Sequence, residues 1–307
     1  MKSPVLSILF LLISVTLLAV PNDFRFRHFS VEDGLSSNSV RAIMQDKYGF
    51  LWIGTEEGLN RYDGIMIKSY SICPQAAGKY ISSLYGTKKN IWIGTDEGIY
   101  IYAYATETFT YFDLTTPNNV RITSIVNHIL QDKDGNLWFS TNGQGLFRYN
   151  LSKNYLEQYE FTSAFGIVAS TMADSDNQVW ALTNQGESGV YKLNKAENKF
   201  EPFGLLYNAG NHHSQALAML EDSEQTLWLG TWECGLQKID KYTRQTTTYL
   251  HPTDGKGVTH IHSLMEYAPH QLLIGSDDGL LLFNTLTEEY KLFTENETVP
   301  NSLSNRY

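Results

Sequence analysis

The sequence has few cysteines and few basic residues, and each shortage argues against a class of protein. Its 307 residues include two cysteines, Cys73 and Cys234, with no CxxC metal spacing. Two cysteines cannot form a disulfide framework. Lysine and arginine number 23 against 33 aspartates and glutamates, which gives a formal net charge of −10, and no basic stripe is visible. This balance argues against a nucleic-acid partner, because a polyanion would be repelled.

Long apolar runs are confined to the first 20 residues, "MKSPVLSILFLLISVTLLAV". Lys2 followed by this run predicts a secretory signal peptide over residues 1–20. An uncleaved membrane anchor is the alternative, because Leu17 is a poor residue for a cleavage site after Ala19. Residues 21–307 then form an exported domain, in which no other stretch approaches the roughly 20 apolar residues of a membrane span.

Aromatic residues and glycines are abundant, and they recur in a repeated pattern. The segment "FLWIGTEEGLNRYDG" at 50–64 returns as "NIWIGTDEGIYIY" at 90–102 and in four later versions. The copies lie 40 to 48 residues apart and align on five tryptophans and one leucine: Trp52, Trp92, Trp138, Trp180, Trp228 and Leu273. This period is typical of a propeller blade or a helical array. Helices are excluded because the copies are rich in β-branched and aromatic residues, are interrupted by glycine every few residues and show no 3.6-residue periodicity.

Each copy predicts four short strands, shown by the first: "VRAIMQD", "FLWIGT", "LNRYD" and "MIKSYS". Aspartate and glycine in the intervening "DKYG" favour a tight turn, and the glycine of "GT" lets a neighbouring backbone approach. A single sheet of this kind has two faces to bury, which radial stacking achieves. The predicted fold is therefore all-β, a β-propeller of four-stranded blades over residues 21–307.

The residues at two aligned positions support the prediction that the first strand of each copy lies nearest the propeller axis, where the blades come close together. The position two before the turn aspartate is large and apolar in every copy: Met44, Leu84, Leu130, Met172, Leu220 and Met265. Two residues earlier, all but the histidine are small: Ala42, Ser82, His128, Ser170, Ala218 and Ser263. Small residues suit the strand nearest the propeller axis.

Six copies are complete, and a seventh begins at "PNSLSNRY". We expect a seven-bladed ring cut short, because "SLSNRY" resembles "GLSSNSV" at the entry to the first copy; a six-bladed ring with a tail is the alternative. An early strand, "FRFRHFS" at 24–30, has no blade of its own, and we expect it to belong to the last blade.

The segment "HFSVEDGLSSNSVRAIMQDKYGFLWIGTEEGLNRYDG" resembles the opening of periplasmic sensor regions of Bacteroides-type hybrid two-component regulators. The pattern D-x-x-G-x-L-W-I-G-T-x-x-G-L is similar to their regulator-propeller repeat, over essentially residues 24–307. The resemblance implies a periplasmic β-propeller that senses glycan fragments. It also implies as partners a second propeller and kinase domains in a longer chain, or a second copy in a homodimer. No kinase motif is found in the 307 residues.

Candidate ligand-binding residues lie where copies five and six depart from the repeat. The fifth second-to-third-strand turn reads "TWECGL", with Trp232 where the first copies have acids. An aromatic residue at a turn tip favours a stacking platform for a sugar, against the alternative that it packs on the neighbouring link. The links into copies five and six add one tyrosine and four histidines: Tyr207, His212, His213, His260 and His262. Solvated or hydrogen-bonded histidines are favoured over a metal site, which needs a fixed ligand cluster.

Other candidates have structural alternatives of equal or greater weight. Arg41 could hold a carboxylate or sulfate at the channel mouth, or pair with a nearby acid such as Glu56. Cys234 reads as a small hydrophobe rather than a nucleophile. The segment "DKDGN" at 132–136 resembles half of a calcium loop, but the same place reads "DKYGF" and "DSEQT" in other copies, which favours a turn.

We therefore expect a non-enzymatic binding module that recognises an oligosaccharide, without catalytic residues, metal or cofactor. The alternatives are a propeller lyase or glycosidase and a protein-binding scaffold. A glycosidase needs two carboxylates at a set separation, whereas the acids here lie mostly in repeated turns. The signature GH…WD of WD40 scaffolds is missing.

Overall fold

In the computed structural model, residues 24–72, 79–161, 166–183, 189–204, 215–251, 257–296 and 302–303 are described. They contain one short 3₁₀-helix, η1 (Val31–Asp33), and strands that form four-stranded antiparallel sheets, each built from four consecutive strands. The predicted signal peptide at 1–20 lies outside the described residues. Within the described ranges, no helix is long and apolar enough to cross a membrane.

The first three blades follow one another along the chain. Their strands are β1 (Val40–Gln45), β2 (Leu51–Thr55), β3 (Gly58–Tyr62) and β4 (Ile67–Tyr70); β5 (Ile81–Gly86), β6 (Asn90–Thr95), β7 (Gly98–Ala103) and β8 (Thr108–Tyr111); and β9 (Val126–Gln131), β10 (Leu137–Thr141), β11 (Leu146–Asn150) and β12 (Tyr155–Tyr159).

The second three blades repeat this order. Their strands are β13 (Val168–Ala173), β14 (Val179–Thr183), β15 (Val190–Asn194) and β16 (Lys199–Pro202); β17 (Ala216–Glu221), β18 (Leu227–Thr231), β19 (Leu236–Ile239) and β20 (Thr246–Tyr249); and β21 (Ile261–Ala268), β22 (Gln271–Ser276), β23 (Gly279–Asn284) and β24 (Tyr290–Phe293).

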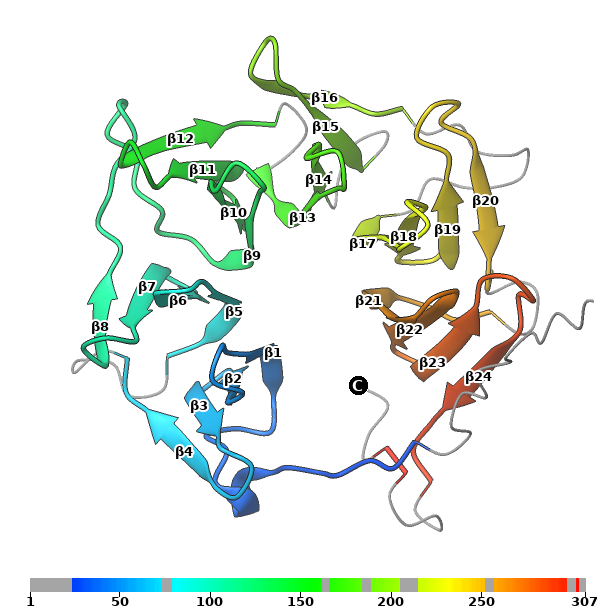
Figure 1. The fold of residues 1–307 in the computed structure, drawn as a ribbon, viewed down its shortest axis with the longest axis horizontal. Helices are drawn as coiled ribbons and strands as arrows, with labels where there is room; N and C mark the ends of the chain where they lie inside the picture. Colours follow the sequence, from blue (N-terminus) through cyan, green and yellow to red (C-terminus); the bar gives the residue numbers. More distant parts are fainter. Residues whose placement is uncertain are drawn as a thin grey trace, which may run out of the picture.

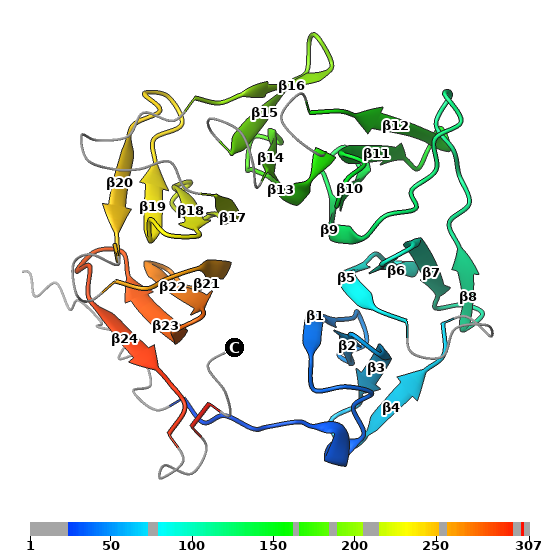
Figure 2. The ribbon, with the colours of Figure 1, turned by 180° about the vertical axis from the view of Figure 1, so that it is seen from behind.

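The blades stand radially around an axis, with the first strand of each blade innermost (Figures 1 and 2). The core lies between blades. Between the second and third, for example, Trp92 and Ile99 pack against Phe139 and Phe147. The five repeat tryptophans are at most 3% exposed. The glycine of the "GT" pair is needed for this packing, since a Cβ at Gly54 would lie 2.5 Å from Ile81 of the next inner strand.

The second blade departs from the predicted alignment. Tyr85, and not Leu84, pairs with Trp92, and Ser83, not Ser82, pairs with Gly94. The first two strands of the blade are joined at 87–90 by a turn with Thr87 at its start, one residue shorter than the turn that Asp46 begins. This deletion shifts the inner strand by one residue. The assignment of Leu84 and Ser82 to the two inner-strand positions was therefore wrong at this blade, whereas Trp92 is the repeat tryptophan as expected.

The described chain forms six blades, so the preference for a seven-bladed ring is not supported. Successive inner strands pack together from β1 with β5 round to β17 with β21, but β21 and β1 do not pack in this way. Figure 1 shows the sixth and first blades on either side of this break. The inner strands that flank it leave Ile43 66% and Met265 53% exposed. The residues "PNSLSNRY" lie mostly outside the described part of the chain.

The segment at 24–30 forms no strand in the structure, contrary to the prediction. It does lie against the sixth blade, where the Phe24 and Phe26 rings contact that of Phe293 at centroid distances of 5.0 and 5.9 Å. It then crosses to the first blade, where the Arg27 guanidinium donates to the Tyr62 hydroxyl at 2.8 Å. The contact is made by side chains rather than by backbone pairing.

Candidate functional site

Trp232 opens the turn between β18 and β19, and backbone hydrogen bonds tie this turn to both neighbouring links. Its N–H donates to the Gln215 carbonyl at 3.0 Å, and its carbonyl accepts from the N–H of His260 at 2.9 Å. The Thr231 hydroxyl closes the turn by donating to the Gly235 carbonyl at 2.7 Å. Gly235 has a φ of +68°, the left-handed conformation that glycine adopts without strain. These bonds and the glycine hold the turn that carries the Trp232 side chain.

The imidazole of His260 stacks on the indole of Trp232, with a centroid distance of 3.8 Å and an interplanar angle of 26°. His262 meets the same indole edge-on at 6.3 Å. His260 has a φ of +44°, which is uncommon for a residue other than glycine. Such a conformation costs about 1–2 kcal/mol and persists only where the surroundings enforce it. The stacked arrangement is therefore held by its neighbours.

Asp277, in the turn between β22 and β23, joins the two histidines. Its carboxylate bonds the Nδ1 of His260 and, at 2.6 Å, the Nε2 of His262. Partial burial raises the pKa of Asp277, but the bonds from both imidazoles outweigh this and hold the pKa below its usual value. The neighbouring Asp278 accepts from the Thr259 N–H at 2.7 Å and fixes the link that carries His260.

The four side chains form one partly exposed cluster. Trp232 is 37% exposed, and the side chains of His262 and Asp277 are 48% and 32% exposed. An indole edge, two imidazoles and a carboxylate offer an apolar surface beside hydrogen-bond donors and acceptors, the mixture found in small-molecule sites. Among the described residues, no group of three or more His, Cys, Asp or Glu side chains could hold a metal ion.

The structure thus brings together Trp232, His260 and His262 of the predicted residues. Arg41 does not join them. It lies on the first blade, where its Nε donates to Glu56 at 3.0 Å, the structural alternative considered for it. Tyr207, His212 and His213 lie outside the described residues, as does Cys73. Cys234 is buried beside the Trp232 turn, and its N–H donates to the Thr231 hydroxyl at 3.0 Å.

Sequence reasoning missed Asp277, although the repeat contains the signal. The strand registers place Ala42 opposite Gly54 and Ser263 opposite Gly275, so His262 and Asp277 occupy the positions of Arg41 and Glu56. The same alignment puts Trp232 at the position of Glu56 in the fifth blade. A pair that serves as a surface ion pair in blade one is therefore replaced by a histidine–aspartate pair in blade six, next to an aromatic ring.

Comparisons with known proteins identify the repeat. Two segments, residues 34–57 and 120–143, match the family model described as two component regulator propeller. These two segments are thus similar to two-component regulator propeller repeats. The matches span the first hairpins of blades one and three. The resemblance inferred from the sequence is confirmed.

The chain is also similar to parts of larger proteins. It is 26% identical to "Histidine kinase P4" of Formosa agariphila over 303 residues, covering 93% of this chain and 22% of that relative. The chain thus spans about a fifth of the length of the curated relative it matches. A solved structure described as the extracellular domain of a hybrid two component system, BT3049 from B. thetaiotaomicron, matches with a TM-score of 0.77 and 24% identity, over 93% of this chain and 39% of that one.

A further solved structure, virginiamycin B lyase from Staphylococcus aureus, has a TM-score of 0.66 and 14% identity over 83% of each chain. At this identity the likeness shows the propeller fold alone, and fold does not establish chemistry.

Proposed function

We propose that this regulator propeller is the ligand-sensing part of a hybrid two-component system, and that it recognises glycan fragments in the periplasm. Kinase domains in a longer chain would receive the signal. The repeat family, the similarity to a histidine kinase and the likeness to an extracellular domain of a hybrid system support this proposal. The likeness to a lyase supports only the fold, so an enzymatic function is not favoured.

The observation that carries the proposal is the cluster of Trp232, His260, His262 and Asp277. Three of its residues, Trp232, His262 and Asp277, stand where blade one has an exposed ion pair, and the cluster forms a partly exposed aromatic surface beside polar groups. Folding of the blade does not require this replacement, because blade one folds with Arg41 and Glu56 at the equivalent positions. A departure from the repeat that folding does not require is best explained by ligand recognition.

His260 covers one face of the indole, so a sugar ring would stack on the exposed part of Trp232 that remains. Sugar hydroxyls would bond the exposed imidazole of His262 and the carboxylate of Asp277. His260 then acts as a support that fixes the indole, and Asp277 fixes both imidazoles. Such pre-ordering reduces the entropy lost when a ligand binds.

The test is titration calorimetry of the purified chain with a panel of plant and host oligosaccharides. For any oligosaccharide that binds, Trp232→Ala should weaken the affinity about tenfold, since a stacking contact on an aromatic ring contributes about 0.5–1.5 kcal/mol beyond the area it buries and about 1.4 kcal/mol corresponds to a factor of ten. Tyr48→Ala is the control, because Tyr48 is a 62% exposed aromatic residue in a turn of the first blade. Unchanged affinity of a folded Trp232→Ala variant would place the glycan site elsewhere.

A further inference from the structure

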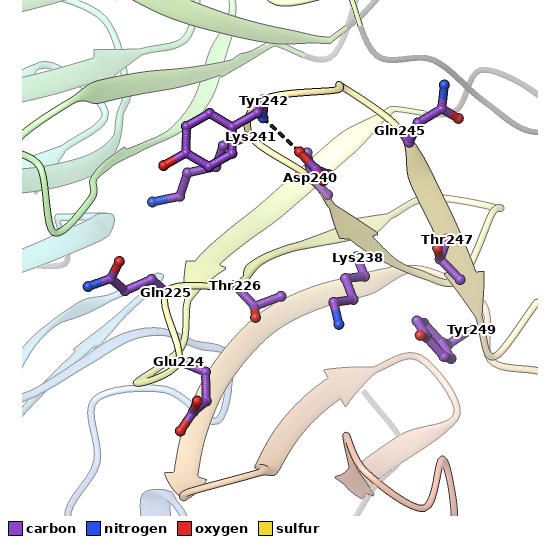
Figure 3. A pocket seen from close by; sticks show the side chains of 11 residues that line it. Glu224, Gln225, Thr226, Lys238, Asp240, Lys241, Tyr242, Gln245, Thr247 and Tyr249 are labelled. Atoms are coloured by element: carbon purple, nitrogen blue, oxygen red, sulfur yellow. Dashed lines mark hydrogen bonds between the residues drawn. The ribbon is translucent and has the colours of Figure 1, made fainter.

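Two neighbouring pockets lie on blades four and five, at the ends of the strands opposite to Trp232. The fifth-blade pocket has a volume of about 530 Å³ and is lined by the β17–β18 turn, β19, the β19–β20 turn and β20 (Figure 3). The fourth-blade pocket has a volume of about 560 Å³ and lies between β15, β16 and the same β19–β20 turn. Both volumes fall within the range of small-molecule sites, roughly 300–1,000 Å³.

The two pockets occupy the same position of the repeat. In each, a lysine ammonium lies over the buried tryptophan of its blade: Lys238 is 6.0 Å from the Trp228 ring and Lys192 is 5.2 Å from that of Trp180. In blade three the equivalent cation, Arg148, forms an ion pair with Glu157 directly across the strands. In blade three the cation over the tryptophan is therefore neutralised by an acid on the neighbouring strand.

The fifth blade lacks this countercharge, and in the fourth blade the acid at this position forms no ion pair with the lysine opposite it. Thr247 stands opposite Lys238, and the Glu201 opposite Lys192 instead bonds Asn194 Nδ2 at 3.2 Å and lies 3.5 Å from Lys199. Among the described residues, no carboxylate lies within ion-pairing distance of four cations that line the pockets: Lys192, Lys195, Lys238 and Arg244. The acidic chain thus carries a local excess of unpaired positive charge here.

The remaining charges of the two pockets are accounted for. Lys241 forms an ion pair with Glu221, and Asp240 accepts from the backbone N–H groups of Tyr242 and Thr243 at 2.8 Å each. Glu224 is the remaining acid and lies at the edge of the fifth-blade pocket in Figure 3. The interior of that pocket between Lys238 and Tyr249 is therefore uncharged apart from the lysine.

Tyr242 links the two pockets. It lines both of them, and its side chain is 90% exposed at the tip of the β19–β20 turn. A ring held this far into solvent does not pack in the core and is available as a stacking surface for a ligand. The order of groups along this surface is cation, aromatic ring, cation.

We propose that the two pockets and Tyr242 form a second binding site, for an acidic oligosaccharide. A sugar ring stacks on Tyr242, and the carboxylates of its neighbours enter the pockets and bind Lys238 and Lys192. Hydroxyl and amide groups that line the fifth-blade pocket, Thr226, Gln245 and Thr247, are available to sugar hydroxyls. These groups favour a carbohydrate over an acidic peptide. The site does not depend on the cluster at Trp232.

The experiment measures binding of tetragalacturonate to the whole chain by titration calorimetry at low ionic strength, with neutral galactotetraose in a parallel arm. We expect the acidic sugar to bind and the neutral one not to. Lys238→Gln and Lys192→Gln should each weaken binding about tenfold, as expected for loss of a charge-assisted bond. Lys153→Gln, in the equivalent turn of blade three, removes the same charge and should leave the affinity unchanged.

Three results would overturn the proposal: equal binding of both sugars, equal losses from Lys153→Gln and Lys238→Gln, or equal affinity for tetraglutamate, which would show a site for acidic peptides. If a sulfated galactotetraose binds and tetragalacturonate does not, the site does not recognise a carboxylate, and the proposal is also overturned. Trp232→Ala should not change binding of tetragalacturonate at this site. A failure of this proposal can therefore be told apart from a failure of the proposed glycan site at Trp232.

Discussion

Trp138 donates its indole N–H to Oδ2 of Asp132 at 2.8 Å, so the turn aspartate of the repeat bonds the tryptophan at the centre of its blade. The same bond joins Trp52 to Asp46, Trp180 to Asp174 and Trp228 to Asp222. In blade two Thr87 replaces the aspartate, and the indole nitrogen of Trp92 is buried without a partner. The aspartate therefore does more than shape the turn, because it satisfies a buried donor.

Asp132→Ala should destabilise the chain by about 2–4 kcal/mol. The change leaves the Trp138 indole N–H buried and unsatisfied and removes three bonds from Asn136. Thr87→Ala is the matched control and should cost about 1 kcal/mol, since Trp92 gains no bond from Thr87. Denaturant unfolding with an unchanged m-value measures both. Equal losses would show that the indole bond contributes nothing.

Because of the break between the sixth and first blades, we expect the same substitution to have a large effect on stability in one blade and a small effect at the equivalent position of another. Ile129 and Ile43 occupy equivalent places on β9 and β1, but Ile129 is 2% exposed and Ile43 66% exposed. Ile129→Ala should cost about 2–4 kcal/mol through lost packing. Ile43→Ala should change the free energy of unfolding by less than about 0.5 kcal/mol. A large loss from Ile43→Ala would show that another blade or a second copy covers this face in solution.

The blades could be predicted from the sequence because most copies repeat the residues that a blade needs: a buried tryptophan, a glycine at the close approach and a turn aspartate. Closure of the ring could not be predicted, because it depends on contact between the first and last copies rather than on any residue within a copy. The register of blade two was missed for a local reason, the shorter turn after Gly86.

The candidate site was predictable only in part. Trp232, His260 and His262 stood out as departures from the repeat. Asp277 did not, because an acid is usual at that turn and its role depends on the histidine opposite. The pockets on blades four and five were also missed, since a lysine over a tryptophan looks the same in sequence whether or not an acid faces it. In blade five the difference is Thr247 in place of Glu157, and in blade four it is the bond from Asn194 to the Glu201 that faces Lys192.

His128 predicts a loss of stability in acid. Burial lowers its pKa to about 4, while the N–H of Thr171 donates to its Nδ1 at 3.4 Å. Between pH 6.5 and 4 the unfolded chain binds a proton at this residue that the folded chain does not, so stability falls as pH decreases through that window. His128→Asn should lack this part of the pH dependence. Parallel stability profiles of the two proteins between pH 7 and 4 would contradict the prediction.

Asp277 predicts a second pH effect, with a different origin. Its pKa is held below the usual value although partial burial raises it, because both imidazoles bond the carboxylate. The ionised group therefore contributes stability above the ordinary aspartate pKa of about 3.9, and the contribution is lost as pH falls through the lowered value. Because the side chain is 32% exposed, we expect a modest effect, about 1 kcal/mol at neutral pH.

Asp277→Asn should remove this contribution, so that wild type and variant differ at pH 7 and converge towards pH 2–3, as measured by denaturant unfolding. Glu56→Gln is the matched control, since Glu56 occupies the same repeat position in blade one and pairs with the exposed Arg41. Exposed ion pairs contribute little, so this variant should behave as the wild type at every pH. A loss from Asp277→Asn that persists undiminished at low pH would show that its carboxylate acts through packing rather than through the charge that orders His260 and His262 beneath Trp232.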